Sequence, residues 1–182
     1  MRSAIGGRRA WVAASTHPGE EEAVAEAHRQ AASANPDLLT IVVPRHPDRA
    51  AEAAAVFGAR GLPVGRRSAD GRPTAGTAVF VGDTLGELGL WYRLGELAFV
   101  GGSLAPRGGH NPIEPARLGC PVLLGPHLAH VEELAAPLLA AGGARTVADA
   151  SALAEAVAGL LADPAGLAAM SHRALAVAEA GG

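Results

Sequence analysis

Short and almost wholly apolar runs alternate with helical stretches along the whole chain of 182 residues. The runs predict strands at 9–15, 38–43, 63–68, 77–81, 97–100, 121–124 and 144–147. Alanine-rich or amphipathic stretches predict helices at about 19–35, 48–57, 85–94, 112–118, 131–141, 150–162 and 165–178. Strands without polar alternation, each followed by a helix, indicate a parallel sheet with both faces covered. The predicted fold class is α/β, a doubly wound and mainly parallel Rossmann-like sheet in a single domain over residues 1–182.

The composition excludes several classes of chemistry. All 15 basic residues are arginines, so a Walker-type phosphate lysine, a Schiff-base lysine and a pyridoxal-phosphate site are impossible. The net charge of −3 and the aromatic content of 3% give no basic field and no stacking platform, so nucleic acid is not an expected partner. Cys120, the only cysteine, is expected to be a small buried apolar residue. With neither a signal peptide nor an apolar run of membrane-spanning length, the chain is expected to be cytoplasmic.

Polar or glycine-containing turns follow five of the predicted strands. They lie at 15–17, 44–47, 82–84, 101–103 and 125–127. Ligands of doubly wound sheets bind outside the carboxyl ends of the strands. These turns therefore predict a cleft for a polar ligand along one edge of the sheet.

The segment 101–115, Gly-Gly-Ser-Leu-Ala-Pro-Arg-Gly-Gly-His-Asn-Pro-Ile-Glu-Pro, carries the strongest motif. Helix capping alone accounts for Asn111 as N-cap, Pro112 as first helical residue and Glu114 as the third residue of a capping box. Capping does not account for the preceding 108–110, because a glycine-rich loop that leads into a helix is typical of anion sites. Since Glu114 would repel a phosphate, its expected partner is a hydroxyl pair such as a ribose diol.

Two other turns leave alternatives open. Arg45, held between Pro44 and Pro47, either projects into the cleft or pairs with Asp48. The segment 15–20 either contributes to the cleft or is an N-cap followed by acidic residues that stabilise the first helical turn. His127 and His130 are three residues apart, which is a weak metal signal, and no other histidine has metal-ligand spacing. No metal site is therefore predicted.

Six motifs occur in an order that resembles a known family. They are Ala-Ser-Thr-His-Pro-Gly-Glu-Glu-Glu, Val-Pro-Arg-His-Pro-Asp-Arg, Gly-Asp-Thr-Leu-Gly-Glu-Leu, Phe-Val-Gly-Gly-Ser-Leu, Gly-Gly-His-Asn-Pro-Ile-Glu-Pro and Pro-Val-Leu-Leu-Gly-Pro-His. From about residue 8 to residue 175 the chain resembles the C-terminal half of 3-deoxy-D-manno-octulosonic acid (Kdo) transferases of lipopolysaccharide synthesis.

The resemblance implies one half of a GT-B glycosyltransferase that binds the donor, CMP-Kdo, without a metal or another cofactor. The CMP contacts it implies are Pro44, Arg45, Leu85, Gly86, Glu87, Asn111, Pro112, Ile113 and Glu114. Further candidate contacts in the cleft are Ser15, Thr16, His17, Gly102, Ser103, Gly109 and His110. It also implies that 85–87 open a helix, where backbone N–H groups are free.

The rest of such an enzyme would lie in an N-terminal half. The resemblance implies that this half holds the site for the lipid A precursor, the glutamate general base and the surface that associates with the membrane. The whole enzyme would then work at the cytoplasmic face of the inner membrane. Residues 1–7 do not resemble the start of the family, so the chain is expected to be a fragment that carries no catalytic residue and does not turn over alone. The alternatives are another GT-B enzyme of nucleotide sugars, such as an epimerase or a UDP-sugar transferase, and a non-catalytic nucleotide-binding module.

Overall fold

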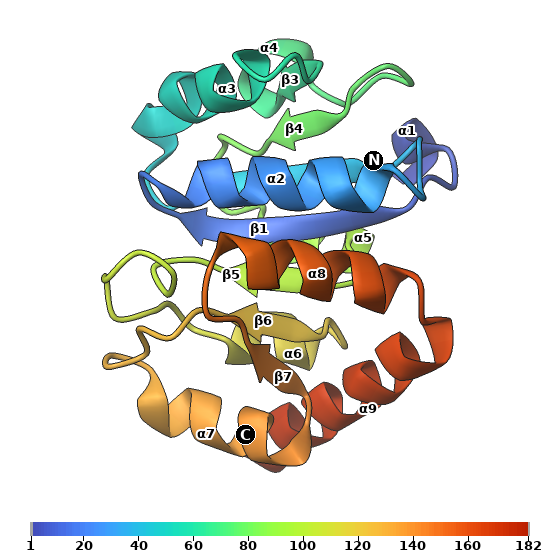
Figure 1. Cartoon of the computed structure of the whole chain (residues 1–182). Coiled ribbons are helices and arrows are strands. Elements are labelled where there is room, and N and C mark those ends of the chain that lie inside the picture. The colour runs from blue at the N-terminus through green and yellow to red at the C-terminus, as the bar shows by residue number, and fades with distance from the viewer. Residues whose placement is uncertain (1, 182) are drawn as a thin grey trace.

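A sheet of seven parallel strands runs through the computed structural model, which describes residues 2–181 (Figure 1). The strand order is β3-β4-β2-β1-β5-β6-β7, and every neighbouring pair is parallel. The strands are β1 (Ala10–Thr16), β2 (Leu39–Pro44), β3 (Val64–Arg66), β4 (Val79–Val81), β5 (Ala98–Val100), β6 (Val122–Leu124) and β7 (Ala144–Thr146). The predicted doubly wound α/β class is confirmed.

Helices cover both faces of this sheet. They are α1 (Arg2–Ile5), α2 (Glu20–Ala32), η1 (Pro47–Arg49), α3 (Ala50–Gly58), α4 (Arg67–Asp70), α5 (Leu88–Leu94), α6 (Ile113–Arg117), α7 (Glu132–Ala141), α8 (Ala150–Leu161) and α9 (Pro164–Ala180). Helices α2 and α8 lie side by side over one face (Figure 1). The opposite face packs against α5 around the centre of the sheet and against α6, α7 and α9 toward β7.

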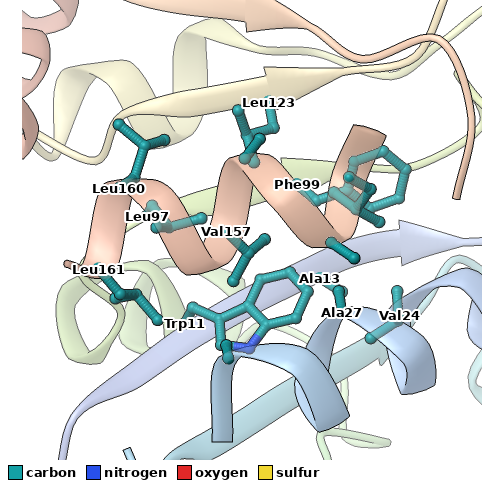
Figure 2. Close-up of a cluster of buried hydrophobic side chains, with 14 of the residues drawn as sticks. Trp11, Ala13, Val24, Ala27, Leu97, Phe99, Leu123, Val157, Leu160 and Leu161 are labelled. Carbon is teal, nitrogen blue, oxygen red and sulfur yellow. The ribbon is translucent and has the colours of Figure 1, made fainter. Parts of the chain in front are cut away.

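Alternation along the strands builds one core on each face. Trp11 of β1 points toward α2 and α8, whereas its neighbour Val12 points toward α5. Trp11, Phe99 and Val157 belong to the cluster under α2 and α8 shown in Figure 2. Small residues of α2 such as Ala27 let that helix approach the strands closely. Cys120 lies in the opposite core and is 2% exposed, and burial raises the pKa of its thiol to about 12.

Three predicted boundaries were wrong near the carboxyl edge of the sheet. Helix α5 begins at Leu88, so residues 85–87 form a turn before it and do not open it. Gly86 has a φ of 79°, a left-handed conformation outside the helical region. The predicted strand 63–68 ends at Arg66, and the next four residues form α4. Helix α6 begins at Ile113, one residue after its predicted start.

Within residues 2–181, no single helix has both the length and the hydropathy of a membrane span; helices α8 and α9, which are bent by 104°, pass that test only as a pair.

Candidate functional site

The parallel sheet places the ends of all its strands at one edge, and β1 lies at the point where the strand order reverses. From β1 the chain builds one side of the sheet with β2, β3 and β4, and then returns to place β5 on the other side of β1. Ligands of open α/β sheets bind at such a switch point. The turns after β1 and β5 flank it.

The turn after β1 does not contain the side-chain N-cap that one interpretation of 15–20 required. Ser15 has a φ of 57° and lies where the register with β2 shifts. Helix α2 is instead preceded by Gly19, which has a left-handed conformation and gives no side-chain cap. Thr16 ends β1, and its hydroxyl donates to Oε1 of Glu21 at 3.0 Å. The Arg49 guanidinium donates to the same oxygen at 3.1 Å, so Glu21 is a buried partner of Arg49.

Glu20 lies at the centre of the switch point, and its carboxylate is 1% exposed. Its Oε2 accepts the N–H groups of His17 and Gly102, both at 2.9 Å. Its Oε1 accepts the N–H groups of Ser103 at 3.2 Å and of Leu104 and Ala105 at 3.0 Å. The loop after β5 is thus wrapped around a carboxylate of the chain itself.

Close packing fixes the shape of this loop. A Cβ at Gly101 would lie 2.5 Å from the Ser15 carbonyl oxygen, and a Cβ at Gly125 would lie 2.2 Å from that of Ser103. The Ser103 hydroxyl donates to the Val100 carbonyl at 2.6 Å and accepts the Gly125 N–H at 2.8 Å. Ser103 is fully buried, so its hydroxyl is engaged inside the fold.

Three histidines lie close together beside the N–H groups that bind Glu20. The Nε2 atoms of His17 and His110 are 2.8 Å apart, and the His46 ring meets that of His17 edge-on at 6.0 Å. Burial lowers the pKa of both His17 and His110, and the neighbouring cationic groups lower it further, Arg107 acting on His17 and Arg45 on His110. His17 is 8% exposed, whereas His46 is exposed.

Arg45 stands exposed at the end of β2. Its backbone N–H donates to the Thr16 carbonyl at 3.0 Å. Among residues 2–181 it forms no ion pair with Asp48, so that alternative is not realised; Arg49 makes the ion pairs of this segment, with Glu21 and Glu52. The Arg45 guanidinium is therefore available to a ligand next to His110.

Two arginines at the end of β3 and the start of α4 hold the turn after β4. Arg66 and Ser68 bind the Asp83 carboxylate, and these hydrogen bonds outweigh the burial that would raise its pKa and lower it overall. Arg67 binds Glu87 at 2.8 Å and, together with Thr84, lowers the pKa of that carboxyl. The Glu87 side chain is thus already paired, and the 85–87 turn presents Leu85, which is 85% exposed.

The segment 109–114 combines a glycine turn with one side-chain hydrogen bond at the start of α6. Gly109 has a φ of 82°, and Asn111 Oδ1 accepts the N–H of Ile113, the first residue of α6, at 2.9 Å. The N-cap position is occupied by Pro112, not by Asn111 as predicted, and gives no side-chain cap. Glu114 does not complete a capping box within the described residues, because it makes no hydrogen bond there. It is exposed and lies close enough to Tyr92 of α5 for its charge to raise the pKa of that buried phenol further. Pro112 is buried beneath this turn.

The described part of the chain contains no group of three or more histidine, cysteine, aspartate or glutamate side chains that could hold a metal ion. A cavity of about 530 Å³ between α6, α7 and α9 begins at Asn111 and Ile113. It adjoins only one of the three predicted donor segments.

The structure brings the predicted donor segments to one edge but gives their side chains different roles. Arg45, Leu85 and Glu114 are exposed there. The backbone N–H groups of Gly102 and Ser103 donate to the Glu20 carboxylate. The role of Glu20 was not predicted, since an acidic residue at a helix start is explained by the helix dipole alone. The roles of Arg66 and Arg67 were not predicted either, because their partners are distant in sequence.

Comparisons with known proteins agree with the sequence resemblance. No protein-family model matches the chain. The 3-deoxy-D-manno-octulosonic acid transferase of Haemophilus influenzae is 41% identical over 152 residues, which make up 83% of this chain and 36% of that protein. The transferase of Bordetella pertussis is 42% identical and covers 96% of this chain and 42% of itself. The chain thus spans about two fifths of the length of these relatives.

Among solved structures, the C-terminal CMP-Kdo binding domain of WaaA from Acinetobacter baumannii is 33% identical, with a TM-score of 0.89 over 95% of this chain and 90% of that one. A putative UDP-N-acetylglucosamine 2-epimerase from Listeria monocytogenes, 16% identical with a TM-score of 0.62 over 93% of this chain and 40% of its own, shares the fold. The ordered motifs, the all-parallel sheet and these identities together show that the chain belongs to the family of Kdo transferases, glycosyltransferases of GT-B type, and corresponds to their C-terminal domain.

Proposed function

We propose that this chain binds CMP-Kdo and forms the donor-binding half of a glycosyltransferase that transfers Kdo to the lipid A precursor in lipopolysaccharide biosynthesis. The observation that carries the proposal is the likeness, along 95% of the chain, to a domain described as CMP-Kdo binding. The exposed Arg45 at the carboxyl edge supports it, because a free guanidinium is suited to a phosphate or a carboxylate.

Three segments bind the nucleotide in this proposal. Arg45, at the end of β2, pairs with the phosphate. The turn 85–87 offers its backbone and the Leu85 side chain, since the Glu87 carboxylate is already held by Arg67. Asn111 and Glu114 flank the start of α6, where Glu114 has a free carboxylate for the ribose hydroxyls. Helices α5 and α6 contact each other, which supports a single ligand reaching both.

The reaction in this proposal is an inverting transfer with an oxocarbenium-like centre on the sugar while CMP departs. Negative charge grows on the departing phosphate, and Arg45 stabilises it electrostatically. The proposal assigns that role to Arg45 and not to a metal ion or another cofactor. The general base and the site for the lipid acceptor are contributed by the other half of the enzyme, at the cytoplasmic face of the inner membrane.

Calorimetric titration of the chain with CMP, UMP and UDP tests the donor assignment. CMP is expected to bind most tightly. Tighter binding of UDP would favour a different GT-B enzyme of nucleotide sugars, and absence of CMP binding would contradict the proposal.

A transfer assay with CMP-Kdo and the lipid A precursor tests the division of labour between the two halves. The chain alone is expected to transfer no Kdo, because the acceptor site and the general base are assigned elsewhere. Turnover by the purified chain would contradict that division.

A further inference from the structure

The carboxylate of Glu20 occupies the place where a doubly wound fold offers an anion site. The turns after β1 and β5 flank the switch point of the sheet, and Glu20 lies between them. Successive backbone N–H groups that converge in a loop form the concave nest that proteins use to bind phosphate. Here the nest exists, and its occupant is covalently part of the chain.

The cradle, defined as the N–H groups of His17 and of residues 102–105, is saturated by this carboxylate. Two N–H groups point at Oε2 and three at Oε1, at 2.9–3.2 Å. A carboxylate has about four lone-pair sites, so five donors leave it no capacity for a further partner. No N–H group of the cradle remains for an external phosphate.

We propose that Glu20 is a built-in anion that fills the phosphate cradle and thereby selects a donor with a single phosphate over one with a diphosphate. The selectivity rests on the proposed function, because it concerns the nucleotide bound there. Arg45, which directly follows β2, the strand next to β1, remains free to neutralise one phosphate. A second phosphate that extended toward the switch point would meet a buried carboxylate and find no N–H donors.

Electrostatics gives this exclusion its strength. Like charges repel several times more strongly in a partly buried site than in water, because the effective dielectric constant is lower. The Glu20 carboxylate accepts five backbone N–H groups, and Gly101 and Gly125 pack directly against the carbonyl oxygens of Ser15 and Ser103. A movement of the carboxylate away from a second phosphate would break these hydrogen bonds, so it would not relieve the unfavourable interaction without loss of stability.

The first arm of the test empties the cradle. Glu20→Ala removes a group close in size and charge to acetate and leaves five converging N–H donors. Thermal unfolding of this variant is expected to shift upward, with saturation, on addition of acetate or inorganic phosphate but not of sodium chloride at equal ionic strength. The wild type is expected to show no gain with acetate and a smaller gain with phosphate than Glu20→Ala, since its cradle is filled and only Arg45 remains for the anion. If Glu20→Ala folds only when acetate is present, the yield on refolding replaces thermal unfolding as the measurement. The proposed cradle is overturned if neither measurement shows a gain that is specific to acetate or phosphate.

The second arm measures selectivity by titration with CMP and CDP. The wild type is expected to bind CMP at least about tenfold more tightly than CDP, a difference of about 1.4 kcal/mol. Glu20→Gln keeps the shape but removes the charge, so the ratio of the two dissociation constants should fall toward one. Glu21→Gln is the matched control, because Glu21 is as buried but binds Thr16 and Arg49 outside the cradle; it should keep the wild-type ratio.

The outcomes separate the two proposals. A wild type that binds CMP but does not prefer it to CDP, or a Glu20→Gln variant that keeps the full preference, overturns the selectivity and leaves the proposed function intact. A wild type that binds neither nucleotide overturns the proposed function and the selectivity together, while the anion arm still decides whether the cradle exists.

Discussion

The Nε2 atoms of His17 and His110 lie 2.8 Å apart, and their rings stack with 11° between the planes. Such a bond needs a proton on one nitrogen and a lone pair on the other, so the two rings cannot both be fully protonated while it persists. Burial lowers the pKa of both rings, and Arg45 and Arg107 act in the same direction. The lowered pKa values favour the neutral form of both rings near neutral pH, and a bound anion would favour protonation of one of them.

Proton uptake on binding CMP is the first prediction. A phosphate beside Arg45 raises the pKa of the histidine pair, so the complex binds more protons than the free protein does. The affinity for CMP should therefore increase as pH falls from about 8 to about 6. Titration across this range should show a steeper gain for the wild type than for His110→Gln. The protonation of CMP itself is common to both proteins and cancels in the comparison. Identical pH profiles would contradict the involvement of the pair.

Arg45 carries the second prediction. Arg45→Ala should weaken CMP binding by about 1.5–3 kcal/mol, the range for a charged hydrogen bond, without lowering thermal stability, because Arg45 forms no ion pair with Asp48. Arg45→Lys should recover only part of the affinity, since lysine lacks the planar fork. Arg60→Ala, at the exposed end of α3, is the control and should bind as the wild type does. Unchanged affinity in Arg45→Ala would remove Arg45 from the site.

The third prediction separates binding from capping at the start of α6. Glu114 is exposed and makes no hydrogen bond among the described residues, so Glu114→Gln should not change thermal stability. It should weaken CMP binding by about 1 kcal/mol, because a neutral acceptor binds ribose hydroxyls less strongly than a charged one. A 2′,3′-dideoxy-CMP should bind both proteins alike. Equal affinity of both proteins for CMP would show that Glu114 does not contact the ribose.

Asn111 is the matched case for stability at the start of α6. Its Oδ1 accepts the N–H of Ile113, so Asn111→Ala should lower the free energy of unfolding by about 1 kcal/mol, as loss of one such hydrogen bond does. Chemical denaturation of Asn111→Ala and Glu114→Gln side by side measures this difference. Equal stabilities would mean that the hydrogen bond of Asn111 to Ile113 does not stabilise the fold.

The architecture was predictable because it depends on features that are local in sequence. Continuous apolar strands, each followed by a helix, indicate the parallel sheet without knowledge of any long-range contact. The predicted boundaries of helices and strands were wrong where a long-range contact determines the local structure. Arg67, which the apolar pattern assigns to a strand, lies in α4, where it binds Glu87 at a distance of twenty residues. The conformation of glycine also determines a boundary, because Gly86 is left-handed and α5 begins three residues later than predicted.

The turns at the carboxyl edge were largely predictable, whereas the contacts of their residues were not. The rule that ligands bind at strand ends singled out the turns after five of the seven strands, including that of Arg45, but not those after β3 and β7. It could not tell that the N–H groups of the Gly-Gly-Ser loop are already taken by Glu20, because 82–85 residues separate the partners. An acidic residue in a first helical turn is explained by the helix dipole alone, and nothing in the sequence separates Glu20 from Glu21 or Glu22.

The last prediction concerns His28, a buried histidine far from the proposed ligand contacts. It is 3% exposed on α2, and its Nδ1 shares a hydrogen bond of 2.8 Å with the Thr40 hydroxyl of β2. Burial, with a smaller effect of the Arg8 charge, lowers its pKa to about 4. Above the unfolded value of about 6.5 the ring is neutral in both states. As pH falls from about 6.5 to about 4, only the unfolded chain gains the proton. The free energy of unfolding therefore falls by up to about 3 kcal/mol.

Denaturant unfolding of the wild type, His28→Gln and His172→Gln near pH 7.5 and near pH 4.5 measures this loss. Glutamine can still bond to Thr40 but does not titrate, so His28→Gln should lose less stability on acidification than the wild type does. His172 is exposed on α9, and its replacement should leave the pH dependence unchanged. Since every other titrating group is common to the three proteins, the difference between the variants isolates the proton on His28. An equal loss in all three would mean that the folded protein accommodates the charged ring, and burial beside Thr40 would then not control its titration.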